Sequence, residues 1–312
     1  MKTTLTILTS VLLTLATAMG QTAREYMVEA NRAQAYFDYS SALKLMGKAV
    51  KEEPDNAEIR LERGNLNMMV ERFDKAKEDF SYVLGLDSMN VYAWAGMADY
   101  HRNVAEPDTA LKCAELAQIL AYDKLSLALA KIALADVHLA EGREDTALSL
   151  YIVSLEIDST NVPALKKTAR LMVDNDRIDE ANSYLLSAYA QDRFDMEVMV
   201  NLAFTFNKLE FFSDAVFYCN QALELDPQHP LTLSNRAYAF MNMGMDDEAL
   251  SDIKKSLSND GANPLAHKYA GEIYLSLKEN SKACKSFKKA QKFGYEDLYG
   301  NELSKIIENN CN

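Results

Sequence analysis

The stretch that decides the fold is Met196–His229, MEVMVNLAFTFNKLEFFSDAVFYCNQALELDPQH. Its apolar residues recur at helical spacing and predict two short amphipathic helices that meet at a turn near Glu210–Ser213. Ala203 and Ala215 lie where the two helices would cross. Pro227 is expected to stop the second helix, because proline cannot continue a helical hydrogen-bond pattern.

Small residues recur along the whole chain at the same period. The spacings within the column that contains Ala215 are 34 residues, with a single spacing of 37. Its members are Ala42, Ala76, Ala110, Ala147, Ala181, Ala215, Ala249 and Ala283. A second column runs twelve residues earlier and contains Ala30, Gly64, Ala98, Ala135, Ala169, Ala203, Ala237 and Gly271. Two such columns at one period indicate an array of helical repeats.

The period divides the chain into eight repeat units and a C-terminal segment. The units are expected at residues 23–56, 57–90, 91–124, 128–161, 162–195, 196–229, 230–263 and 264–297, with Leu125–Leu127 as an insertion. A long join over Ala121–Leu127 is expected at that insertion. The remaining residues, 298–312, place Leu303, Ile306 and Ile307 on one apolar stripe. They predict a capping helix that shields the last unit from water.

The pattern resembles the tetratricopeptide repeat (TPR) family. The third unit carries Trp94, Ala98, Ala110 and Ala117 at the family's positions. The sixth carries Leu202, Ala203, Phe206, Phe212, Ala215, Ala222 and Pro227, and the eighth carries Gly271, Tyr274, Ala283, Phe287 and Ala290. The resemblance implies an all-α fold, a right-handed α-solenoid of about eight helix-turn-helix units with a C-terminal capping helix. It is specific for the fold but not for the ligand.

Residues 1–20, MKTTLTILTSVLLTLATAMG, have the pattern of a signal peptide. Lys2 precedes a short apolar stretch, and small residues follow at Ala16, Ala18 and Gly20. The sequence therefore predicts an exported protein, in the periplasm or outside a Gram-negative bacterium, with no membrane insertion after cleavage. Asp108–Ala110, Asp145–Ala147 and Asp87–Met89 resemble the acceptor motif of periplasmic O-glycosylation in Bacteroidetes. The same residues also coincide with turns, which favour Asp, Ser and Thr.

The charge balance is strongly acidic. The formal net charge is −13, and removing residues 1–20 takes away one lysine and no acid, which gives −14. Nucleic-acid binding requires clustered Lys and Arg, so this balance argues against that function. It also argues against attachment to anionic membrane surfaces.

The cysteines and histidines form no recognisable metal or catalytic motif. Cys113, Cys219, Cys284 and Cys311 lack CxxC spacing, and the four histidines are scattered. We therefore expect no metal, no cofactor and no enzymatic activity. Cys219 is expected to be a small buried residue on an apolar helix face. A disulfide between Cys284 and Cys311 would staple the C-terminal end, but the sequence alone does not fix the connectivity.

The TPR resemblance also suggests where a ligand would bind. TPR proteins usually bind in a concave groove lined by first-helix positions two, five, six, nine, twelve and thirteen. In units five to seven these positions give the candidate groove residues Lys166, Arg170, Asn201, Phe204, Lys208, Asn235 and Tyr238. Lys166, Asn201 and Asn235 match the carboxylate clamp of chaperone-binding TPR proteins, whereas Arg170 and Leu231 depart from it.

Two functions follow from this candidate groove. The first is a non-enzymatic scaffold that binds an extended peptide or partner protein, possibly one that bears a carboxylate, which Lys and Arg would recognise. The alternative is a binding protein for a small anionic or glycan ligand. The sequence names neither the partner nor the oligomeric state.

Overall fold

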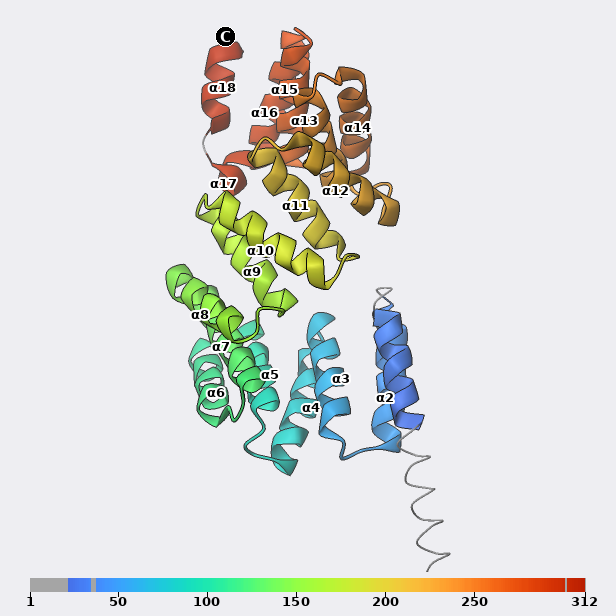
Figure 1. The fold of residues 1–312 in the computed structure, drawn as a ribbon, viewed down its shortest axis with the longest axis vertical. Coiled ribbons are helices and arrows are strands. Elements are labelled where there is room, and N and C mark those ends of the chain that lie inside the picture. Colours follow the sequence, from blue (N-terminus) through green and yellow to red (C-terminus); the bar gives the residue numbers. More distant parts are fainter. Residues whose placement is uncertain (1–21, 35–37, 301, 312) are drawn as a thin grey trace, which may run out of the picture. The chain divides into compact units, whose positions relative to one another are not determined.

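The computed structural model describes residues 22–34, 38–300 and 302–311, and the predicted signal peptide lies outside this part of the chain. The described residues form helices joined by short turns (Figure 1). They group into two compact units, which are divided between Ser159 and Thr160 and are called unit 1 and unit 2 below. No helix in the described part of the chain is both long and apolar enough to span a bilayer.

Unit 1 is a series of paired helices. Residues 22–34 are helical, and the elements that follow are α2 (Tyr39–Glu52), α3 (Ala57–Met69), α4 (Phe73–Leu86), α5 (Val91–Asn103), α6 (Pro107–Leu120), α7 (Lys124–Ala140) and α8 (Glu144–Ile157). Helix α3 packs on α4, α5 on α6 and α7 on α8.

Unit 2 continues the same arrangement. Its helices are α9 (Val162–Asp174), α10 (Ile178–Gln191), α11 (Met196–Lys208), α12 (Phe212–Leu225), α13 (Pro230–Asn242), α14 (Asp246–Asn259), α15 (Pro264–Ser276), α16 (Asn280–Lys292), α17 (Tyr295–Tyr299) and α18 (Glu302–Asn310). The pairs α9 with α10, α11 with α12, α13 with α14 and α15 with α16 pack most extensively.

Both columns of small residues lie at the contacts between helices, as predicted. All eight alanines of the column that contains Ala215 are 0% exposed. The members of the other column are buried as well. Two helices approach closely where such residues face each other, so that larger neighbours interlock around them.

Large buried side chains fill the space beside the small residues. In unit 1 the Phe80 ring is 0% exposed and lies against two glycines, Gly64 on α3 and Gly96 on α5. A Cβ atom at Gly64 would lie 2.5 Å from the ring, and one at Gly96 would lie 2.6 Å from it. In unit 2 Phe287 lies against Gly271 in the same way, at 2.3 Å. Phe80 of α4 therefore packs against both α3 and α5, because the glycine on each of these helices has no side chain.

We expect Gly96→Ala to destabilise unit 1. Overpacking a core costs about 1–3 kcal/mol, and the better helix propensity of alanine returns only about 1 kcal/mol of it. Chemical denaturation of the chain without residues 1–20 measures the difference. Adding Phe80→Leu to Gly96→Ala should restore part of the loss, so the two changes should be non-additive. A Gly96→Ala variant as stable as the parent would show that the ring is free to shift.

Each turn within a helix pair from α3–α4 onward contains one residue in the left-handed region. These residues are Glu71, Ala105, Gly142, Asp176, Glu210, Gly244 and Lys278, with φ between 58° and 76°. They occupy the same place in seven successive repeats, yet only two of them are glycine. The left-handed conformation disfavours residues that carry a Cβ, so the other five turns hold some backbone strain.

We expect Ala105→Gly to stabilise the fold. Ala105 is exposed and has a φ of 58°, so the substitution relieves strain without removing a packed side chain. The gain should be about 0.5 kcal/mol, because relief of roughly 1 kcal/mol of strain is offset in part by the entropy of glycine in the unfolded chain. Gly142→Ala, at the equivalent turn, should lose about the same amount in a parallel denaturation measurement. Equal stability of all three proteins would contradict the strain argument.

The first helices of the pairs begin with side-chain caps. Asn56, Asn90, Asn161, Asp195 and Asn263 each accept a hydrogen bond from the backbone N–H three residues later. Asparagine and aspartate are favoured at this position because they satisfy an N–H that the helix leaves unpaired. The aspartates just after the preceding helices act differently. Asp87, for example, accepts from the N–H of Met89 inside the turn.

The join between the third and fourth units is shorter than the sequence suggests. Asp123 and Ser126 form a capping box, so α7 begins at Lys124. Such a box satisfies two backbone N–H groups at once and fixes the start of a helix. The inserted residues Leu125–Leu127 therefore extend the first turn of α7 and do not lengthen a loop.

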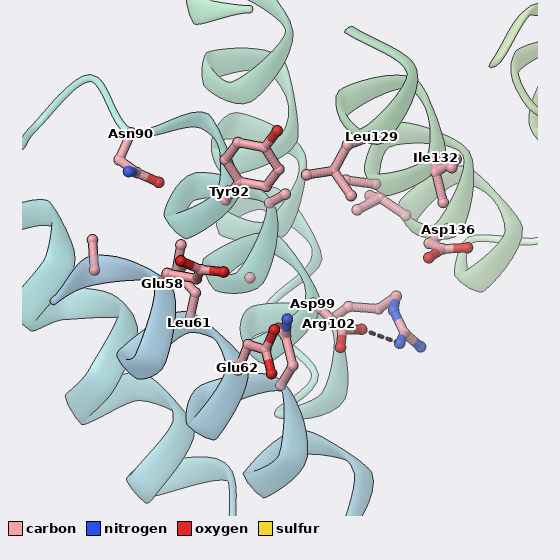
Figure 2. A pocket seen from close by; sticks show the side chains of 16 residues that line it. Glu58, Leu61, Glu62, Asn90, Tyr92, Asp99, Arg102, Leu129, Ile132 and Asp136 are labelled. Carbon is pink, nitrogen blue, oxygen red and sulfur yellow. Dashed lines mark hydrogen bonds and ion pairs between the residues drawn. The ribbon is translucent and has the colours of Figure 1, made fainter. Parts of the chain in front are cut away.

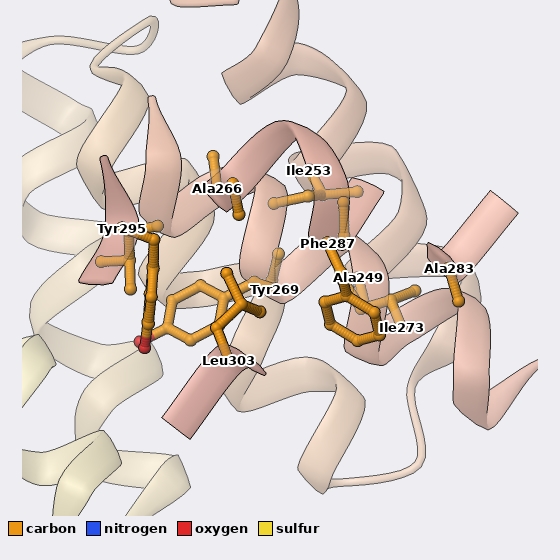
Figure 3. Close-up of a cluster of buried hydrophobic side chains, with 13 residues drawn as sticks. Ala249, Ile253, Ala266, Tyr269, Ile273, Ala283, Phe287, Tyr295 and Leu303 are labelled. Atoms are coloured by element: carbon orange, nitrogen blue, oxygen red, sulfur yellow. The ribbon is translucent and has the colours of Figure 1, made fainter. Parts of the chain in front are cut away.

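The C-terminal segment contains two short helices where one was expected. Gly294 and Gly300 have φ values of 82° and 92°, and they separate α16 from α17 and α17 from α18. Leu303 of α18 is 0% exposed and packs into the cluster around Tyr269, Ile273 and Phe287 (Figure 3). Helix α18 thereby covers apolar surface of the last helix pair, as a cap should.

Two cysteines hold this segment in place. Cys284 of α16 and Cys311 form a disulfide with their Cα atoms 5.5 Å apart. Cross-linking residues 27 apart restricts the unfolded chain, which contributes roughly 3 kcal/mol in the chain-entropy description. Cys113 and Cys219 are buried free thiols, which confirms the prediction for Cys219.

Candidate functional site

A pocket of about 660 Å³ lies on the first helices of three successive helix pairs in unit 1 (Figure 2). Its lining comes from α3, α5 and α7, together with Asn90, which caps α5. The lining residues are Ala57, Glu58, Leu61, Glu62, Asn65, Asn90, Tyr92, Ala95, Gly96, Asp99, Arg102, Leu129, Ile132, Ala133, Asp136 and Val137. A pocket of this size is in the range that holds small ligands or a few side chains.

The lining residues repeat in register. Positions two, five, six and nine of three successive repeats all contribute: Glu58, Leu61, Glu62 and Asn65; Tyr92, Ala95, Gly96 and Asp99; Leu129, Ile132, Ala133 and Asp136. These are groove positions implied by the TPR resemblance, but they belong to the second, third and fourth repeats and not to the fifth, sixth and seventh. The signal was therefore present in the sequence. The prediction from the sequence selected groove positions with cationic and aromatic side chains, and those lie in the fifth to seventh repeats.

One wall of the pocket is apolar. Leu61, Ala95 and Ile132 offer aliphatic surface. In Figure 2 the ring of Tyr92 and the side chain of Leu129 lie toward each other. The Tyr92 side chain is 40% exposed, so its ring is accessible from solvent. Such a wall can take an apolar or aliphatic side chain of a ligand.

The other wall is acidic. Glu58 and Glu62 come from α3, Asp99 from α5 and Asp136 from α7. Arg102 is the one cation among the lining residues, and it forms an ion pair with Asp99 (Figure 2). The Tyr151 hydroxyl donates to Asp136. The lining therefore holds four carboxylates and one guanidinium.

The pKa of Glu62 reflects the burial and the negative charge around this carboxyl group. Burial raises this pKa above its ordinary value, and the negative charge of Glu58 raises it further, while a hydrogen bond with Asn31 opposes both. Burial and a like charge both disfavour the ionised form of a carboxyl group. An ionised Glu62 is thus a destabilising feature of the empty pocket.

We expect Glu62→Gln to raise the melting temperature of residues 21–312 at pH 7.5. Between the ordinary and the raised pKa the native state binds more protons than the unfolded state, so stability falls as the pH rises through this window. The variant has no ionisable group at position 62, so its stability does not fall in this pH window. Its advantage should shrink as the pH is lowered through the raised pKa, where Glu62 is protonated.

Differential scanning calorimetry at several pH values measures the effect. Glu248→Gln, which removes an exposed carboxylate on α14, serves as the control and should change little. A Glu62→Gln variant that melts below the parent at pH 7.5 would show that the carboxylate stabilises the pocket.

The cations predicted in the groove of unit 2 are placed differently. Lys166 of α9 lies 3.0 Å from Asp195 and also contacts Glu197. Burial lowers the pKa of its ammonium, but these two carboxylates outweigh burial and raise it. Arg170 is 81% exposed and lies 3.9 Å from Asp174. The charge of Lys166 is already neutralised within the chain.

The remaining predicted residues lie on α11 and α13, and Lys208 and Tyr238 both lie near Glu272 of α15. Lys208 lies 5.7 Å from the ring centroid of Phe204, which is half-buried like Asn201. Asn235 is 2% exposed, and its amide donates to the backbone oxygen of Val200 at 3.4 Å.

Tyr238 of α13 stacks on Tyr269 of α15, with 4.5 Å between the ring centroids. The seven residues thus make several local contacts within unit 2. Their role in binding stays a prediction.

The helix pairs, their small-residue contacts and their repeat length define a TPR fold. The solved structure of the Cut9–Hcn1 hetero-tetramer of the APC/C aligns with 88% of this chain and 53% of its own, at 16% identity and a TM-score of 0.66. The C-terminal part of a TPR repeat-containing protein from Cytophaga hutchinsonii aligns with 78% of this chain and 98% of its own, at 15% identity and a TM-score of 0.52. These likenesses show the fold alone.

Curated relatives match a smaller part of the chain. DnaJ homolog subfamily C member 7 from Homo sapiens is 29% identical over 86 residues, which is 28% of this chain and 17% of the relative. Sperm-associated antigen 1 from Mus musculus is 31% identical over 91 residues, which is 29% of this chain and 10% of the relative. No family model matches the chain.

Proposed function

We propose that this protein is a non-enzymatic interaction scaffold that binds an extended segment of a partner protein in the pocket of unit 1. The observation that carries the proposal is the register of the lining, because positions two, five, six and nine of three successive repeats face one cavity. Solenoid repeats characteristically present such concave surfaces to their ligands.

The pocket has the parts that a peptide groove needs. Asn65 and Asn90 carry side-chain amides that can hydrogen-bond to an extended backbone. Tyr92 and Leu129 offer surface to an apolar side chain of the partner, and a half-exposed aromatic ring is a common binding hot spot. A small anionic ligand fits this pocket poorly, because four carboxylates face one guanidinium there.

We further propose that the scaffold works outside the cytoplasm. The proposal rests on residues 1–20, which have the charge, apolar stretch and small residues of a signal peptide. A disulfide between Cys284 and Cys311 suits an oxidising compartment. Secretion of a fusion reporter through these twenty residues, with cleavage after residue 18 or 20, would support it.

We expect a photocrosslinking residue at position 65 to trap the partner in extracts of the bacterial envelope. Asn65 is exposed and lines the pocket, so a probe there reaches a bound segment without disturbing the core. Tyr92→Ala should weaken the adduct roughly fivefold to tenfold, as loss of a hot-spot aromatic does. Phe217→Ala removes an aromatic ring that is 51% exposed in unit 2 and should leave the adduct unchanged.

Circular dichroism and melting temperature verify that the variants stay folded. A probe at Lys112, which lies on α6 outside the pocket, tests specificity. Adducts that form from Lys112 and not from position 65 would place the interface on another face and overturn the proposal.

A further inference from the structure

We infer that the segment bound in unit 1 is cationic, with a lysine or arginine beside Glu58 and Glu62 and an apolar neighbour against Tyr92 and Leu129. This inference rests on the proposed function, since it specifies the chemistry of the partner for the same pocket. It commits to a protein segment, and a free polyamine is treated below as an outcome of the test.

The carboxylates of α3 carry the first step. Glu58 is exposed and Glu62 is half-buried, and both line the pocket. The single lining cation, Arg102, is bound to Asp99 on its own helix. The lining residues therefore offer Glu58 and Glu62 no countercharge, and a cationic side chain of a ligand would supply it.

Two groove-position acids of unit 2 differ from Glu58 and Glu62 in having an ion-pair partner. Glu197 at position two of its repeat contacts Lys166, and Glu272 at position nine lies 2.8 Å from Lys268. Each of these acids thus has a lysine of the same unit as an ion-pair partner. Glu58 and Glu62 have no such partner among the residues that line the pocket, so acidic composition alone does not account for the difference.

The apolar wall supplies the second step. An arginine or lysine has a long aliphatic stem as well as a charged head, and each part can find its own surface here. The stem can lie on Leu61 with the head beside Glu62, and the face of Tyr92 can hold either the cation or an adjacent apolar side chain (Figure 2). A hydrated metal ion or a small anion would use only one of the two walls.

Three labelled dodecapeptides with one shared sequence test the inference. The first alternates arginine with leucine and serine, the second has glutamine at each arginine position, and the third has glutamate there. Fluorescence anisotropy measures their binding to residues 21–312 at moderate ionic strength. We expect the arginine peptide to bind at least about tenfold more tightly than the glutamine peptide, and the glutamate peptide not to bind.

A matched pair of variants separates the pocket from general attraction. Glu58→Gln with Glu62→Gln removes two charges from the pocket, and Asp247→Asn with Glu248→Gln removes two exposed charges from α14. The pocket variant should bind the arginine peptide roughly tenfold more weakly, and the α14 variant should change binding less than about twofold.

Each other result overturns a defined claim. Equal losses in both variants, or no binding of the arginine peptide up to roughly 1 mM, would overturn the inference of a cationic segment. Equal binding of the arginine and glutamine peptides, weakened alike by Tyr92→Ala, would overturn it while leaving the proposed groove intact. Peptide binding that Tyr92→Ala does not affect would overturn the groove itself. Spermine binding as tight as that of the arginine peptide would overturn the assignment to a protein segment.

Discussion

The close approach of helices at small residues is the constraint on which the structure depends. Where Ala215 and its equivalents face the neighbouring helix, only a methyl group separates the two backbones, and the larger residues around them interlock. Phe80 shows how narrow the tolerance is, because its ring lies against the bare backbone of both Gly64 and Gly96. The period of the small residues therefore sets the period of the helices.

This regularity has a functional consequence. When successive first helices stack at a constant offset, the same positions of each repeat face the same concave surface, whatever residues occupy them. The fold thus fixes where Glu58, Tyr92 and Asp136 converge but leaves their chemistry open. A TPR array can keep its core alanines unchanged while its groove positions vary, and so the fold by itself does not name a ligand.

The sequence predicted the fold well because the fold depends on short-range periodicity. The columns through Ala203 and Ala215 were sufficient to locate the helix contacts, and Leu303 was sufficient to indicate the cap. The site was harder to predict. The charge of Lys166 is neutralised by Asp195 and Glu197 at the start of α11, the first helix of the next repeat, and a list of groove positions does not reveal such pairings.

The pocket of unit 1 works against the stability of the protein that carries it. Burial and Glu58 raise the pKa of Glu62, so the ionised carboxyl group costs free energy whenever the pocket is empty at neutral pH. Elsewhere in the chain, acids at buried positions are paired, as Asp79 is with Arg63 and Asp252 with Arg236. Strain and unbalanced charge in a protein are commonly kept where function needs them. A countercharge that arrives with a ligand would remove the cost, and the energy recovered would become part of the binding free energy.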